Sequence, residues 1–247
     1  GAGCVVVEAT AVTDRGRITN GDVGIWSSAH IPPLKRIVDF MKAQGTIPAI
    51  QLAHAGRKGA MQRPWHGNGA LTADDFARGE KTWPTVSASA EPMAPGHIVP
   101  HAMTPDELGE LVQHWADAAK RAVDAGFEMI EIHNAHGYLV HQFLSPLSNK
   151  RNDAYGGDFA GRTRFPLEIA EAIRKVIPQG MPLFLRVSAV DGIDGGWTMD
   201  DTVAYAKELK TRGVDVIDCS SGGLVGSATV ARIKRTWGFQ VPYAERV

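Results

Sequence analysis

Two histidines and a tyrosine stand close together near the middle of the chain, where a short apolar run ends. His133 closes the run that begins at Glu128, and His136 and Tyr138 follow within five residues. An imidazole pair can bind a metal ion or donate hydrogen bonds to an oxygen, and a phenol can deliver a proton. Two histidines at this spacing after a strand favour a functional role over a structural one.

Two further polar side chains, Gln51 and Arg186, lie within other strand-like apolar runs. Each also has a structural interpretation. Gln51 could satisfy a buried backbone group. Arg186 could pair with Glu8 or Glu131, because a buried guanidinium needs an anion or several acceptors.

Together these residues suit hydride chemistry. Two imidazoles aimed at a carbonyl oxygen would stabilise the enolate that forms when a hydride reaches the β-carbon, and Tyr138 could protonate the α-carbon. Arg186 would stabilise negative charge on a reduced cofactor, and Gln51 would hydrogen-bond a flat polar ring. Since no side chain performs hydride transfer, this chemistry requires a bound cofactor.

A barrel metallohydrolase that uses His133 and His136 is the alternative among enzymes. Such hydrolases usually take carboxylates or further histidines from other strand ends, and the candidates here are Glu8 and Glu131. The chain has no H-x-H or carboxylated-lysine pattern, which favours the oxygen-binding interpretation and predicts no metal ion. A third hypothesis is a catalytically silent barrel fragment that only associates with a partner.

The polar residues belong to an alternation of apolar runs with helical patterns. The runs typical of buried parallel strands are Cys4–Glu8, Pro48–Leu52, Glu128–His133, Pro182–Ser188 and Val214–Cys219. Helices are predicted at 34–45, 104–126, 164–176 and 198–213, from one-sided apolar periodicity and from bounding caps or glycines. Thr104-Pro105-Asp106-Glu107, a capping box, opens the second of them. Strands that alternate with helices predict a parallel α/β sheet.

The sheet is expected to form a (β/α)8 TIM barrel. No G-x-G-x-x-G turn follows the first strand, which disfavours a doubly wound dinucleotide-binding sheet. About five of a barrel's eight βα units are found, because residues 58–103 form a long connection after the second strand. This segment is predicted to be an excursion over the barrel mouth. The polar residues would then converge on one rim, where the C-terminal strand ends meet.

Composition excludes several classes of protein. The net charge is −1 and 44% of the residues are hydrophobic, so a core can form and no basic face suggests a nucleic-acid partner. No apolar run is long enough to cross a bilayer and no secretory signal is visible, which predicts a cytoplasmic protein. Cys4 and Cys219 are too few for a four-cysteine cluster and are expected to be small buried packing residues.

At the residues named above the chain resembles the old yellow enzyme family of FMN-dependent ene-reductases. The resemblance covers nearly the whole chain, and its His/His pair and Arg57-Lys58-Gly59 resemble the xenobiotic-reductase branch. One departure is Gly161, where the family usually has Asn. The segments that carry the resemblance are His133-Asn134-Ala135-His136-Gly137-Tyr138-Leu139, Phe143-Leu144-Ser145, Ser148-Asn149, Tyr155-Gly156-Gly157, Gln51-Leu52-Ala53-His54-Ala55-Gly56-Arg57, Val7-Glu8-Ala9-Thr10-Ala11-Val12 and Gly24-Ile25-Trp26.

The resemblance implies an NADPH dehydrogenase in which NADPH reduces FMN and an activated alkene then takes its place. Ala9 would contact FMN through its backbone, Gln51 would bind the pyrimidine edge, and Arg186 would lie near N1 and O2. The substrate is expected to be a small molecule, an α,β-unsaturated carbonyl or nitro compound. Family members are commonly homodimers or homotetramers.

The resemblance also assigns residues to the substrate. His133 and His136 would bind its electron-withdrawing oxygen, Tyr138 would donate the proton, and the small Ala53 would leave room in the pocket.

Both chain ends fall inside predicted packed elements, which is unusual for an intact domain. Residues 1–247 are therefore expected to be a partial FMN-binding barrel domain that lacks the family's first strand and its last two βα units. Such a chain would leave two sheet edges unpaired, and we expect it to bind FMN poorly and to aggregate when it is expressed alone.

Overall fold

A parallel five-stranded sheet forms the centre of the computed structural model, which describes residues 1–225 and 233–247. Its order is β1-β2-β5-β6-β7, so spatial order follows chain order, as a barrel requires and a doubly wound sheet does not. The strands are β1 Cys4–Ala11, β2 Ile47–Ala53, β5 Met129–Asn134, β6 Leu183–Ser188 and β7 Val216–Ser220. The predicted α/β fold class, a partial TIM barrel, is confirmed.

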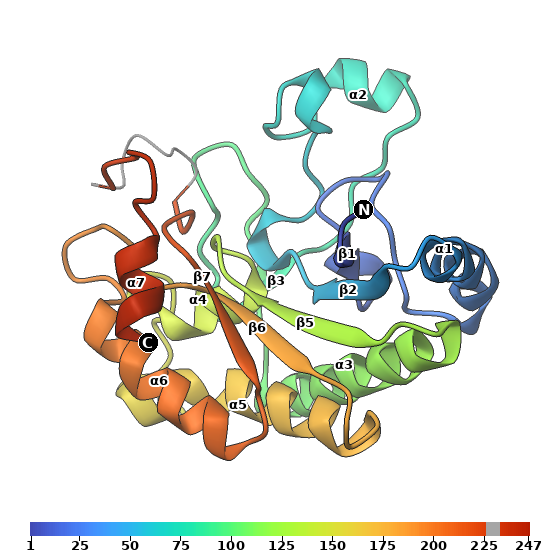
Figure 1. The fold of residues 1–247 in the computed structure, drawn as a ribbon. Coiled ribbons are helices and arrows are strands. Elements are labelled where there is room, and N and C mark those ends of the chain that lie inside the picture. Colours follow the sequence, from blue (N-terminus) through green and yellow to red (C-terminus); the bar gives the residue numbers. More distant parts are fainter. Residues whose placement is uncertain (226–232) are drawn as a thin grey trace.

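Helices line one side of this sheet (Figure 1). The four predicted helices are present as α1, α3, α5 and α6, and the short helices α2, α4 and α7 lie outside the four predicted ranges. The α-helices are α1 Ile31–Ala43, α2 Ala73–Ala77, α3 Pro105–Ala125, α4 Leu139–Leu144, α5 Phe159–Val176, α6 Met199–Thr211 and α7 Val241–Arg246. Short 3-10 turns occupy Asp14–Gly16, Ser28–His30, Gly56–Lys58 and Pro64–His66. The two-residue strands β3 Val86–Ser87 and β4 His101–Ala102 pair with each other in a separate sheet.

The two faces of the sheet differ in polarity. Side chains alternate along a strand, so residues paired in register share a face. Ile130 and Leu185 belong to the face that packs on the helices, where Trp115 of α3 and Phe165 of α5 are also buried. The opposite face carries the register-linked polar residues Gln51, Glu131, His133, Arg186 and Asp218. One face therefore stabilises the fold, and the other is available for chemistry.

The predicted capping box of α3 is present. The Thr104 hydroxyl accepts the Glu107 N–H, and the Glu107 carboxylate accepts the Thr104 N–H at 2.7 Å. At the other end Gly126 adopts a φ of +92°, the left-handed conformation that favours glycine. Both ends of this helix were legible from local sequence alone.

The two edge strands correct one prediction. Among residues 1–225 and 233–247, β1 and β7 each pair with one neighbour only, and the apolar side chains of Val5, Val6 and Val216 are exposed. Cys4 is exposed and Cys219 is half-buried. The prediction that both cysteines are buried packing residues is wrong, because a sheet edge covers its side chains less completely than a central strand.

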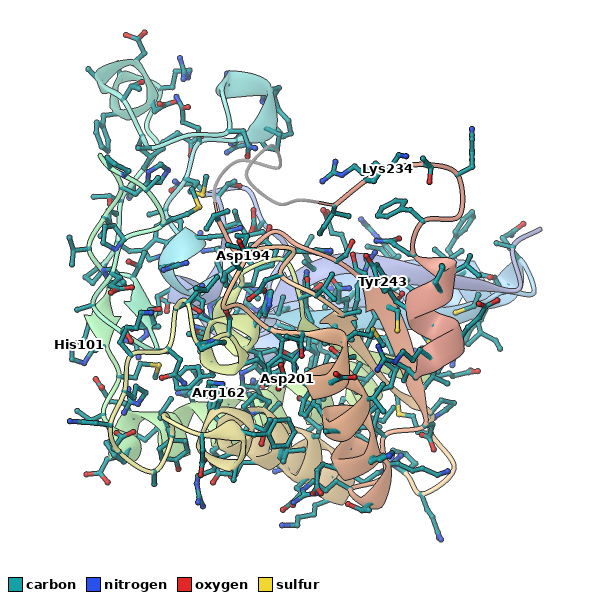
Figure 2. The ribbon with its side chains drawn as sticks, turned by 90° about the vertical axis from the view of Figure 1, so that its left-hand side faces the viewer. His101, Arg162, Asp194, Asp201, Lys234 and Tyr243 are labelled. Carbon is teal, nitrogen blue, oxygen red and sulfur yellow. The ribbon has the colours of Figure 1, made fainter. Side chains whose placement is uncertain are left out.

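Residues 58–103 lie against the loop that follows β1. The Met61 N–H donates to the Ile18 carbonyl at 2.8 Å, and the Trp83 indole N–H donates to the Arg15 carbonyl at 3.0 Å. In Figures 1 and 2 the α2 end of this segment projects from the side of the molecule opposite α5 and α6. The segment therefore lies at the C-terminal ends of the sheet strands, where the predicted polar site residues are. Its role as a cover for the barrel mouth stays a prediction.

Within the described ranges, no helix is both long and apolar enough to cross a membrane.

Removing the α3 cap tests how local sequence supports the fold. Thr104→Ala deletes the hydroxyl that accepts the Glu107 N–H, and we expect it to lower the free energy of unfolding by about 1 kcal/mol. Thr211→Ala, at the exposed end of α6, is the matched control and should change it by less than about 0.5 kcal/mol. Urea denaturation measures both, and equal effects would contradict the assignment of the cap.

Candidate functional site

Three aromatic rings meet at the C-terminal end of β5. The ring centroids of His133 and His136 are 5.3 Å apart, and those of His133 and Tyr138 are 4.9 Å apart. Both pairs are nearly perpendicular, and the His133 side chain is buried. The structure thus brings the three predicted catalytic residues into one cluster.

The turn between these rings has an unusual backbone. His136 has a φ of +59°, a left-handed conformation that few residues other than glycine adopt. Gly137 follows at +72°, and a Cβ on it would lie 2.4 Å from the Gly223 carbonyl oxygen. The residue after His136 must therefore be glycine, for its conformation and for the close approach of the loop that follows β7.

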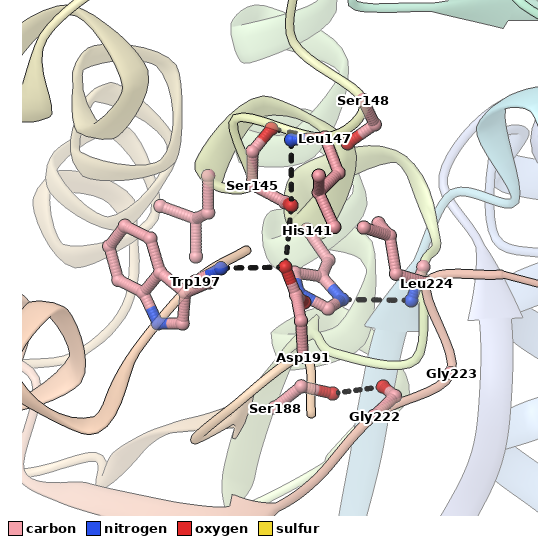
Figure 3. Close-up of polar contacts among 12 residues, drawn as sticks. His141, Ser145, Leu147, Ser148, Ser188, Asp191, Trp197, Gly222, Gly223 and Leu224 are labelled. Carbon is pink, nitrogen blue, oxygen red and sulfur yellow. Dashed lines mark hydrogen bonds and ion pairs between the residues drawn. The ribbon is translucent and has the colours of Figure 1, made fainter. Parts of the chain in front are cut away.

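Hydroxyl groups from the two neighbouring strands hold this turn in place. The His136 N–H donates to Ser188 Oγ at 2.9 Å. Ser188 Oγ in turn donates to the Gly222 carbonyl at 2.7 Å, a bond that Figure 3 shows. His136 Nε2 lies 2.6 Å from Ser220 Oγ. The ends of β5, β6 and β7 thereby form one connected unit.

Lys58 supplies a positive charge beneath the cluster. Its ammonium group donates to the His136 carbonyl at 2.7 Å and also to the Gly223 carbonyl, and it lies 5.5 Å from the centroid of the Tyr138 ring. Burial, with the neighbouring Arg57, lowers the pKa of Lys58 to about 8. Sequence reasoning did not place Lys58 in the site. Its position shortly after β2, at the same end of the sheet, is the signal that could have found it.

Gln51 and Arg186 lie on the polar face with partners that differ from those predicted. Gln51 donates to the Glu131 carboxyl at 2.6 Å, so it pairs with a side chain and not with a backbone group. Arg186 Nε lies 3.1 Å from Asp218 Oδ2, so among the described residues its ion pair is with Asp218 and not with Glu8 or Glu131, the partners of the structural interpretation. The register explains both contacts, because it sets Gln51 beside Glu131 and Arg186 beside Asp218.

Arg186 also connects the polar face to the ring cluster. The register of β5 with β6 places Arg186 beside His133. The positive charge of Arg186 contributes to the lowered pKa of both histidines. Gln51 is paired in register with Glu131. Glu131 precedes His133 by two residues and lies on the same face of the sheet.

Electrostatics keep the cluster neutral. Burial lowers the pKa of His133 well below its usual value, and burial with Arg186 lowers the pKa of His136 to about 4. Burial, with Asp22 nearby, raises the pKa of Tyr138. At neutral pH the site therefore presents two uncharged imidazoles and a protonated phenol. These groups can donate hydrogen bonds to an oxygen and can hold a transferable proton.

Ala9 and Ala53 line a narrow cleft together with Tyr138. Both alanines are on strands that end at this side of the sheet, and the cleft that they line beside the phenol ring is small, about 10 Å³. The residues expected to contact cofactor and substrate thus adjoin the ring cluster.

No group of three or more His, Cys, Asp or Glu side chains is arranged to hold a metal ion in residues 1–225 and 233–247. Glu131 is engaged by Gln51 and does not join His133 and His136 as a third ligand. The metallohydrolase alternative therefore has no donor set within these ranges.

An imidazole pair, a phenol and a neighbouring guanidinium thus lie together where the parallel strands of a barrel sheet end. The model of the NADH:flavin oxidoreductase / NADH oxidase family matches residues 1–245. The chain belongs to this family, which confirms the resemblance to the old yellow enzymes.

Individual relatives agree with this assignment. An NADPH dehydrogenase of Bacillus subtilis is 44% identical over 245 residues, which cover 99% of this chain and 65% of the relative. An NADH:flavin oxidoreductase of Gibberella zeae is 44% identical over 260 residues, covering 100% and 62%. The solved structure of morphinone reductase aligns with a TM-score of 0.76 at 26% identity, covering 99% of this chain and 65% of the other. The chain thus spans somewhat less than two thirds of the length of these proteins.

The lowered pKa of His136 predicts a pH-dependent stability. The folded value is about 4 and the ordinary value is 6.5, so the unfolded chain binds more protons between these two pH values. The free energy of unfolding should therefore fall as the pH drops from 6.5 towards 4. His136→Asn removes this contribution, so urea titrations at pH 7 and pH 5 should differ less for the variant than for the wild type. An equal difference in both proteins would refute the assignment.

Proposed function

We propose that this chain belongs to an FMN-dependent oxidoreductase that reduces activated alkenes, α,β-unsaturated carbonyl or nitro compounds, with NADPH as reductant. The observation that carries the proposal is the cluster of His133, His136 and Tyr138 beside Arg186 on the polar face of a barrel sheet. The names of the relatives, NADPH dehydrogenase and NADH:flavin oxidoreductase, support the choice of cofactor and reductant.

The residues of the polar face fit a flavin. Arg186 Nε is buried and, within the described residues, lies near Asp218 without forming a well-directed hydrogen bond. Gln51 uses one amide N–H for Glu131, and within residues 1–225 and 233–247 its carbonyl oxygen has no partner. A guanidinium and an amide with unused hydrogen-bonding groups can bind the polar edge of a flat ring. Ala9, on the adjoining strand, would contact it through its backbone.

Bound FMN would supply the hydride, because no side chain can. His133 and His136, held neutral, would donate hydrogen bonds to the carbonyl or nitro oxygen of the substrate. These bonds strengthen as negative charge develops on that oxygen, so they lower the barrier selectively. Tyr138 keeps its proton at neutral pH and would deliver it to the α-carbon, while Ala53 leaves space for the substrate.

We also expect a homodimer or homotetramer and a cytoplasmic location. Both stay predictions.

Substitution of the histidines tests the oxygen-binding role. In the complete, FMN-loaded protein, His133→Ala and His136→Ala should each lower kcat/KM for cyclohex-2-enone by about 100-fold, in line with the loss of one oxyanion donor. The bound flavin should remain, because neither residue is assigned to it. Turnover is followed by NADPH oxidation without air, and flavin content by its absorption spectrum.

Lys175→Ala, on α5 away from the site, is the control and should match the wild type. Unchanged turnover in both histidine variants would sink the proposed role. A wild-type protein whose flavin does not bleach on adding NADPH would favour the catalytically silent alternative.

Tyr138→Phe tests the proton donor. The phenol hydroxyl is lost and the ring contact with His133 is kept. We expect the rate of enone reduction to fall by about 100-fold, the usual contribution of a positioned acid, with little change in flavin reduction by NADPH. Stopped-flow measurement of the two half-reactions separates these rates. Equal slowing of both would mean that Tyr138 does not act as the donor.

A further inference from the structure

Behind the ring cluster lies a fully buried histidine that the proposed chemistry does not use. His141 is in α4, and its side chain is 0% exposed. Its Nδ1 accepts the N–H of Gly137 at 2.9 Å, and its Nε2 lies 2.9 Å from Asp191 Oδ1. Gly137 is the residue between His136 and Tyr138. His141 therefore contacts the backbone that joins two of the proposed catalytic side chains.

Asp191, just beyond β6, is also fixed by several contacts. Its other oxygen, Oδ2, accepts the Ser145 hydroxyl at 2.6 Å and the Trp197 N–H at 2.7 Å, as Figure 3 shows. Burial raises the pKa of Asp191, but its bonds to His141, Ser145 and Trp197 outweigh burial, so the net pKa is lowered. The side chain is thus a carboxylate at neutral pH although it has no contact with solvent.

These contacts fix which nitrogen of His141 carries the proton. Nδ1 must be unprotonated to accept the Gly137 N–H, so the proton of the neutral ring is on Nε2, facing the carboxylate of Asp191. The Nε2–H direction is bent from the ideal, so attraction to the charge contributes more than hydrogen-bond alignment. A carboxylate beside one imidazole nitrogen holds a ring in one tautomer and orientation.

Gln142, the next residue of α4, binds the other polar backbone group of Gly137. The Gln142 amide donates to the Gly137 carbonyl at 2.7 Å, so both polar groups of Gly137 are bound by consecutive side chains of one short helix. Gln142 is itself fixed by the Ser87 hydroxyl, which donates to its carbonyl at 2.9 Å. The left-handed turn at His136 is thus held by hydrogen bonds to side chains of α4 and by contacts with Ser188 of β6 and Ser220 of β7.

We infer that Asp191 and His141 form a positioning pair: Asp191 sets the tautomer of His141, His141 holds the Gly137 amide, and this amide sets the relation of His136 to Tyr138. The inference rests on the proposed function, since it concerns the alignment of that site. Neither residue touches substrate or cofactor in this scheme. A displacement of about 1 Å in such an alignment is enough to lower a rate by about 100-fold.

Asp191→Asn is the most direct test, because it keeps the shape and removes the charge. The new amide can donate an N–H to His141 Nε2, which favours the tautomer with its proton on Nδ1 and opposes the Gly137 N–H. In the complete, FMN-loaded protein, kcat for cyclohex-2-enone should fall by at least about tenfold with FMN retained. Long-range ¹H–¹⁵N spectra of ¹⁵N-histidine-labelled protein should show the Nε2–H tautomer of His141 in the wild type and its loss in the variant.

A rescue variant separates positioning from simple stability. His141→Asn retains a carbonyl oxygen near the place of Nδ1, so it should still accept the Gly137 N–H and keep much of kcat, whereas His141→Leu should not. In the His141→Asn background there is no tautomer left to set, and adding Asp191→Asn should cause little further loss of kcat.

Asp75→Asn is the matched control. Asp75 is a buried carboxylate of α2 that accepts bonds from Thr72 and Gln62, and its hydrogen bonds within the described part of the chain do not involve the ring cluster. It should lower the melting temperature without changing the His141 spectrum or kcat.

The outcomes are distinguishable. A wild-type spectrum with the His141 proton on Nδ1 overturns the inference, and so does an altered tautomer in Asp191→Asn with unchanged kcat. Full additivity of the Asp191→Asn loss in the His141→Asn background also overturns it. Absence of enone turnover by the wild type rejects the proposed function, while the spectra still decide the state of the pair.

Discussion

The side-by-side register of β5, β6 and β7 is the constraint on which the site depends. It sets His133 beside Arg186 and Arg186 beside Asp218, so one row across the sheet carries an imidazole, a cation and an anion. Because strand side chains alternate, a slip of one residue would turn this row towards the helices and bury charges in the apolar layer. The tightly packed opposite face therefore fixes the chemistry of the polar face.

The charges around the histidines decide what they can do. Lys58 and Arg186 lie close enough to disfavour further positive charge on His136, and burial acts in the same direction. The imidazoles are thereby kept as neutral donors, which suits binding of an oxygen and not proton exchange. Asp218 and Glu131 balance part of the local positive charge without entering the ring cluster.

Local features of the sequence predicted the fold well, and contacts between distant segments were beyond its reach. Five strands, the Thr104 cap and the Gly126 end of α3 followed from periodicity and short motifs. The His133, His136 and Tyr138 cluster was also legible, because the three lie within one turn. The partner of Arg186 and the role of His141 were missed, because each depends on the register or loop of another strand.

The contact between the loops after β5 and β7 has a consequence for biosynthesis. His136 and Ser220 are 84 residues apart, yet the left-handed turn at His136 contacts Ser220 and Gly223 and is linked to Gly222 through Ser188. A nascent chain that has emerged only as far as Tyr138 already contains both imidazoles, but it lacks Ser188, Ser220 and Gly223, which contact the turn at His136. The turn that carries His136 can therefore take its final conformation only once β7 has been synthesised and has docked beside β6.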